Sequence, residues 1–248
     1  MLGPVETGIL HPIVDFTLSR TREPLWVTAA AAGVALAVVA DHRLWRWFRF
    51  VVTIAHEGGH AGVALLSRRK VHHVRLHADT SGLTVTSGRP TGPGMIATAA
   101  AGYLSPSVLG LLAAAALAAG YVRGVLFGFA VLLLGLLVAV RTVFGVLTVV
   151  GCAAVLIGVA GWTTASVQGA AAVLLCWFLL LAGPRPVLEL QHQRRRGRAP
   201  RSDADQLAAL SRLPAILWVG FFLIFTGLAA LAGAALLLRP WWSELPLG

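Results

Sequence analysis

Two histidines and a glutamate stand close together in the segment His56-Glu57-Gly58-Gly59-His60. Residues four apart lie on one face of a helix, so both imidazoles can reach a single Zn²⁺ ion. The glutamate between them can take a proton from a water molecule, whose pKa such an ion lowers to about 7. The spacing therefore predicts a zinc site with His56 and His60 as ligands and Glu57 as the catalytic group.

The rest of the chain is suited to a lipid bilayer rather than to water. Its 248 residues are 57% hydrophobic and only 12% charged, with a mean hydropathy of +0.79, whereas soluble domains carry about 25% charged residues. An ionisable group inside a membrane helix is costly and is a functional candidate by default. Glu57 is the only acidic residue within the long apolar segments.

Seven apolar segments predict an all-α polytopic protein of the cell membrane, with about seven transmembrane helices. Six spans are the alternative, because Arg141 separates two segments with almost no loop. The segments are Leu25–Ala40, Leu44–Leu66, Met95–Ala119, Val122–Val140, Thr142–Gly161, Gly169–Gly183 and Leu213–Leu238.

The chain is expected to form a single transmembrane domain over residues 25–238, between an N-terminal tail (1–24) and a C-terminal tail (239–248). The motif would lie in a helix spanning 44–66. Residues 71–88 contain two β-prone runs around Ser81-Gly82, which predicts a small β-hairpin directly after that helix.

An Arg-rich linker is expected over residues 184–212, with Gln191–Ala204 outside any helix. Near its end, Ser202 and Asp205 have the spacing of a capping box, which predicts a helix start. Fifteen of the 20 Lys and Arg residues fall on one side of the predicted topology. Since basic loops stay inside, the N-terminus and the linker are expected in the cytoplasm. This placement also argues for contact with the lipid bilayer and against nucleic acid as a partner.

The segment Ala55–Ala61 resembles the HExGHA motif of site-2 proteases, the intramembrane zinc metalloproteases of the M50 superfamily, and the chain is most similar to the M50B-like branch. The predicted hairpin and Ala101–Ser107 also resemble that superfamily, the latter its AGPxAN-like segment without the Asn. The resemblance implies a zinc metalloprotease that cleaves a transmembrane segment of a membrane protein substrate.

Catalytic zinc ordinarily has three protein ligands and one water. The segment Pro184–Leu190 is similar to the P-x-P-x-LDG stretch that carries the third ligand in site-2 proteases, with Glu189 where the Asp is expected. The predicted topology also places Glu189 at the depth of the histidines. Asp203 and Asp205 lie on the same side and are the alternative third ligands, although a role in capping the following helix explains them equally well.

Two other functions fit parts of the same pattern. A non-proteolytic membrane protein with this fold would bind metal or a partner, in keeping with the missing Asn and the altered LDG stretch. A metal transporter would need ionisable residues in several spans, and the sequence provides them in one.

Overall fold

The computed structural model describes residues 23–197 and 202–242, with side chains up to residue 239. The predicted tail 1–24 therefore lies outside the described residues except for its last two positions, as do residues 198–201 of the linker and 243–248 of the C-terminal tail. In chain order the elements are α2 (Leu25–Ala40), α3 (His42–Leu66), β1 (Lys70–Leu76), β2 (Gly82–Ser87), α4 (Pro93–Ala118), α5 (Val122–Leu137), α6 (Val143–Trp162), α7 (Ala165–Ala182), α8 (Pro184–Arg195), α9 (Asp203–Ser211) and α10 (Ala215–Trp242).

Each of the seven apolar segments forms a helix, and the all-α polytopic fold with one small hairpin is confirmed. Among the described residues, however, only four helices are long and apolar enough to cross a membrane, namely α4, α6, α10 and the continuous pair α7–α8. A fifth span results if α2 and α3 count together, although they meet at an angle of 102°. Because α5 has only 16 residues, the number of candidate spans is lower than the seven or six expected.

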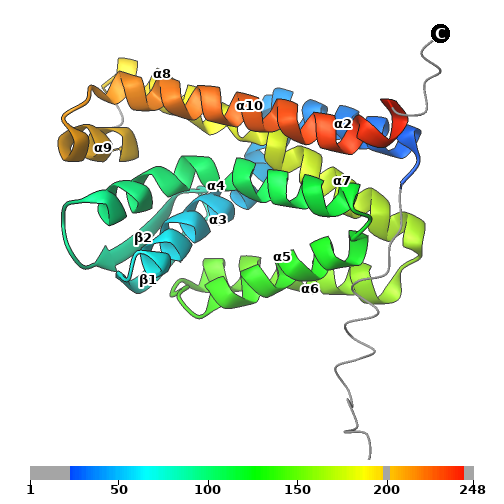
Figure 1. Ribbon diagram of the computed structural model, residues 1–248. Coiled ribbons are helices and arrows are strands. Elements are labelled where there is room, and N and C mark those ends of the chain that lie inside the picture. The colour runs from blue at the N-terminus through cyan, green and yellow to red at the C-terminus, as the bar shows by residue number, and fades with distance from the viewer. Residues whose placement is uncertain (1–22, 198–201, 243–248) are drawn as a thin grey trace, which may run out of the picture.

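The bend between α2 and α3 has a local cause. Asp41 is extended there, and its carboxylate accepts hydrogen bonds from the backbone N–H groups of Arg43 and Leu44. An acidic N-cap of this kind starts a new helix. As a result α3, which carries the His-Glu-His motif, runs obliquely to α2 and reaches the hairpin (Figure 1).

Helix α4 lies at the centre and packs against α3, α7, α9 and α10 (Figure 1). Its inner surface consists largely of small buried residues, including Ala99, Ala100, Ala101 and Gly102. Small side chains let helix backbones approach closely inside a membrane. This close approach brings α4 into contact with the motif on α3.

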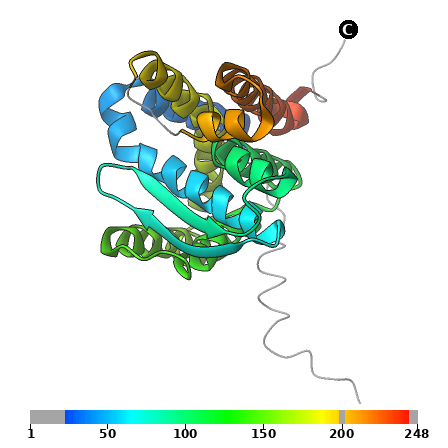
Figure 2. The same cartoon turned by 90° about the vertical axis from the view of Figure 1, so that its left-hand side faces the viewer.

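The hairpin forms where it is predicted, and it lies alongside α3, which both strands contact (Figure 2). The strands are antiparallel, with Val74 opposite Thr84 and Leu76 opposite Gly82. The outer edge of β1 is covered by the turn between α5 and α6, because Val74 donates to the carbonyl of Ala139 and accepts from the N–H of Arg141. No described residue forms a backbone hydrogen bond with the outer side of β2, so β2 is the open edge of the sheet within the described part of the chain.

The predicted linker contains more helix than expected. Helix α8 continues to Arg195, so the expectation that Gln191–Ala204 is non-helical is wrong for Gln191–Arg195. Gln and Arg are good helix formers, and basic residues in a last turn stabilise the helix dipole. Helix α9 starts with the predicted capping box and lies against α4 at the hairpin end of the molecule (Figure 2).

Candidate metal centre

The two motif histidines face each other across one turn of α3. Their Nε2 atoms are 3.1 Å apart. The Nδ1 atom of His60 lies 2.7 Å from the backbone oxygen of Thr98 on α4. Because a carbonyl can only accept, Nδ1 carries the proton and Nε2 keeps a free lone pair, which is the usual arrangement of a metal-binding histidine.

Two glycines make this approach of α3 and α4 possible. A Cβ atom on Gly102 would lie 2.4 Å from Nε2 of His60 and 2.6 Å from Nε2 of His56. On the opposite helix, a Cβ on Gly59 would lie 2.9 Å from the backbone oxygen of Ala101. Close contact between α3 and α4 therefore explains why Gly59 and Gly102 have no side chain.

Asp203, the first residue of α9, completes a group of three possible metal ligands. Its Oδ2 atom is 3.2 Å from Nε2 of His56 and 3.3 Å from Nε2 of His60. All three side chains are largely buried. Burial alone would raise the pKa of Asp203, but the close contact of its carboxylate with both imidazoles holds that pKa below its ordinary value.

The position of Asp203 depends on how α9 is anchored. Ser202 caps the helix, with its hydroxyl accepting from the N–H of Asp205. Ala204 and Leu207 are fully buried in a cluster that includes Val187 of α8. The cap and the buried cluster together fix the first turn of α9 over the histidines.

The three donor atoms fit a zinc ion. Ligand atoms 2.0–2.2 Å from a tetrahedral ion are separated from one another by about 3.3–3.6 Å. The observed separations of 3.1, 3.2 and 3.3 Å lie at or just below the lower end of that range. Two imidazole nitrogens and one carboxylate oxygen are also a donor set that zinc accepts, with a fourth position left open. Among the described residues this is the one such cluster of His, Cys, Asp or Glu.

Glu57 lies beside this group and is buried, at 5% exposure. Its Oε2 atom accepts a hydrogen bond of 2.6 Å from the hydroxyl of Thr84 on β2. Its Oε1 atom lies against Gly82, where a Cβ would come within 2.4 Å. The hairpin thus holds the Glu57 carboxylate in one orientation, which the sequence pattern did not indicate.

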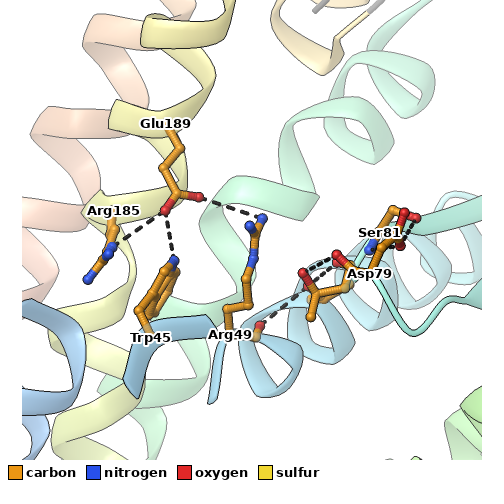
Figure 3. A network of polar contacts seen from close by, with 8 residues as sticks. Trp45, Arg49, Asp79, Ser81, Arg185 and Glu189 are labelled. Carbon is orange, nitrogen blue, oxygen red and sulfur yellow. Dashed lines mark hydrogen bonds and ion pairs between the residues drawn. The ribbon is translucent and has the colours of Figure 1, made fainter. Parts of the chain in front are cut away.

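Glu189, the preferred third ligand, does not belong to this group in the structure and contacts Trp45, Arg49 and Arg185 instead (Figure 3). It accepts a hydrogen bond of 2.7 Å from the indole N–H of Trp45. Its oxygens also lie 3.6 Å from a nitrogen of Arg49 and 3.4 Å from Nε of Arg185. Helix α8 directs this carboxylate toward the first turns of α3. The carboxylate oxygens are therefore occupied by two guanidinium groups and an indole N–H.

Asp205, the other alternative, has the capping role. It forms an ion pair with Arg194, and its second oxygen accepts from the backbone N–H of Ser202 at 3.2 Å. Burial acts to raise its pKa, but the bonds from Arg194 and Ser202 outweigh it and lower that pKa.

Residues 29–233 match the family model described as Peptidase M50B-like. The chain belongs to the M50B-like peptidase family. No curated protein and no solved structure matches the sequence. The match spans the whole candidate site, so the M50B-like peptidase domain contains the hairpin, the His-His-Asp group and Glu189 alike. Membership confirms the expected family and makes this chain a membrane-embedded peptidase.

Proposed function

We propose that this M50B-like peptidase is an intramembrane zinc metalloendopeptidase, which cleaves a transmembrane segment of a protein substrate with zinc-activated water. The observation that carries the proposal is the group of His56, His60 and Asp203, whose donor atoms are separated as around tetrahedral zinc. Catalytic zinc sites have three protein ligands of these types and one open position.

A zinc ion held by these residues would polarise the scissile carbonyl and lower the pKa of the attacking water to about 7. Glu57 accepts the proton of that water. Its Oε2 is engaged by Thr84, which leaves Oε1 for the proton. The same carboxyl group then protonates the leaving amine. Thr98 holds the ring of His60 in the tautomer that the site needs.

The open edge of β2 is suited to hold the substrate. Val74 turns both backbone groups away from β2, so the pair Val74–Thr84 is a non-hydrogen-bonded pair of the ladder. Thr84 therefore turns its own N–H and C=O outward, to the side of β2 where no described segment pairs with it.

The next such pair behaves in the same way. Leu76 bonds through both backbone groups with the hydroxyl of Thr142, so the N–H and C=O of Gly82 opposite it also face outward. An extended peptide that pairs with Gly82 and Thr84 would lie beside Glu57, because Thr84 bonds that carboxylate. A transmembrane helix has no free backbone groups, so the substrate must unwind before it can add as a strand.

The proposal is tested by replacing Glu57 with Gln in protein reconstituted with zinc and a transmembrane substrate. The amide cannot take the proton, so cleavage is expected to fall by about 10²–10⁴-fold. Zinc content should stay at about one ion per chain, because Glu57 is not a ligand in this arrangement. Absence of zinc in the wild-type protein, or undiminished cleavage by Glu57→Gln, would contradict the proposal.

A further inference from the structure

Three hydroxyl-bearing residues of α4, namely Thr98, Tyr103 and Ser105, contact the motif segment of α3. The hydroxyl of Thr98 donates to the backbone oxygen of Gly94 at 2.7 Å, and that of Ser105 donates to the backbone oxygen of Ala101 at 2.6 Å. Both donors are used within the helix. The third, Tyr103, follows Gly102, the residue on which both imidazoles rest.

The ring of Tyr103 is fixed by aromatic contacts on two sides. It meets the ring of His56 edge-on, with centroids 4.8 Å apart and an interplanar angle of 88°. It also stacks on Phe222 of α10, with centroids 5.1 Å apart and an angle of 26°. The phenol is thus held in contact with a residue of the proposed zinc site and cannot turn away freely.

The hydroxyl of Tyr103 has no hydrogen-bond partner among the described residues. The side chain is half-buried. Its oxygen is not among the fully buried side-chain atoms that lack a hydrogen-bond partner, so the oxygen is partly accessible. A polar group in an apolar environment is disfavoured unless it is hydrogen-bonded. A donor that is rigidly placed beside His56 and left unused is therefore available to a substrate.

Hydrolysis of a peptide bond needs such a donor. When water attacks, the carbonyl π electrons move to oxygen, and preorganised donors stabilise that negative charge. A phenol is protonated at neutral pH and can donate one hydrogen bond. Arg49, another donor on α3, is paired with Glu189.

We propose that Tyr103 is a further catalytic residue, whose O–H donates a hydrogen bond to the oxyanion of the tetrahedral intermediate, and this rests on the proposed peptidase function. The proton of Tyr103 is not transferred. Glu57 takes the proton of the attacking water, the carbonyl bond re-forms as the C–N bond breaks, and Glu57 protonates the amine.

The decisive variant is Tyr103→Phe, which keeps both ring contacts and removes only the hydroxyl. Zinc content, kcat and KM for a transmembrane substrate would be measured, together with the Kd of a phosphinic peptide that mimics the tetrahedral intermediate. We expect kcat to fall by about 10²–10³-fold, as for loss of one oxyanion donor. The phosphinic peptide should bind correspondingly more weakly, with zinc content and KM little changed. Ser105→Ala is the matched control, since its hydroxyl is already used inside α4.

Several results would overturn this role. Unchanged kcat in Tyr103→Phe would show that the ring alone matters. Equal weakening of substrate and phosphinic peptide would show that the hydroxyl contributes to substrate binding and not to stabilising the oxyanion. Loss of zinc in Tyr103→Phe would make Tyr103 a support for His56. Failure of the peptidase proposal is recognised separately, because the wild-type protein would then neither bind zinc nor cleave, whatever residue stands at 103.

Discussion

Two carboxylates on the α8–α9 side of the molecule have opposite surroundings. Glu189 lies between the guanidinium groups of Arg49 and Arg185 and accepts from the buried indole of Trp45. Asp203 has two imidazole nitrogens as its near neighbours, each within 3.3 Å. The charge of Glu189 is compensated by the chain itself, whereas the Asp203 group combines three electron-pair donors. That difference makes Asp203 the better proposal for the third ligand.

The comparison also shows what a local sequence similarity can and cannot locate. Pro184–Leu190 resembles a ligand-bearing stretch, and α8 does start there. The direction of the Glu189 side chain, however, depends on Trp45 and Arg49 of α3, which lie some 140 residues away in the chain. A ligand is defined by what surrounds it in space.

The largest expected difference between the two carboxylates is in cleavage. Asp203→Ala removes a proposed ligand, so cleavage of a reconstituted transmembrane substrate should fall by at least about 100-fold, more than loss of an outer-shell partner. Glu189→Ala should retain most of the activity. Asp205→Ala is the control within the same helical turn, since it should weaken only the cap of α9, by about 1 kcal/mol. Equal loss of activity in all three variants would contradict the assignment of Asp203, rather than Glu189 or Asp205, as the third ligand.

A smaller effect is expected from Gly102→Ala. The new Cβ would come within 2.4–2.6 Å of both imidazoles, which must then move apart. Zinc affinity should fall by about 10–100-fold, the range known for disturbed ligand orientation. Gly62→Ala is the matched control, because a Cβ there meets no atom within 4 Å. Chelator competition measures both, and equal affinities would contradict the described contact between α3 and α4.

The smallest effect concerns the stability of the Glu189 cluster. Glu189→Ala leaves the N–H of Trp45, a residue only 1% exposed, without its partner, and a buried donor left unpaired costs about 1–3 kcal/mol. Glu189→Gln retains an oxygen for that bond and should be closer to wild type. The free energy of unfolding in detergent, measured together with the zinc content, distinguishes the two variants. Loss of zinc in either variant would indicate that Glu189 is a zinc ligand.

Much of the fold follows from local patterns in the sequence. The seven apolar segments are helices because long apolar runs satisfy their backbone groups only in that way inside a membrane. The hairpin follows from its β-prone runs, and the start of α9 from the spacing of Ser202 and Asp205. The count of spans was less predictable, because the bend at Asp41 and the shortness of α5 are matters of packing.

The site was predictable where it is local and not where it is built by distant segments. His56, Glu57 and His60 share one helix, so their spacing alone suggests chemistry. Thr84 and Thr98 have no signature of their own, although Thr84 contacts Glu57 and Thr98 contacts His60. Gly102 lies in the segment that resembles AGPxAN, but that resemblance did not indicate its contact with both imidazoles. The sequence could name Asp203 only as one of several acidic residues on the predicted cytoplasmic side. Its approach to the histidines depends on how α9 packs on α4.

The most direct test of the central claim is an anomalous scattering map at the zinc edge from crystals of the zinc-loaded Glu57→Gln protein. A single peak is predicted 2.0–2.2 Å from Nε2 of His56, Nε2 of His60 and a carboxylate oxygen of Asp203. A peak beside Glu189, or one bound by the histidines while Asp203 stays apart, would contradict it.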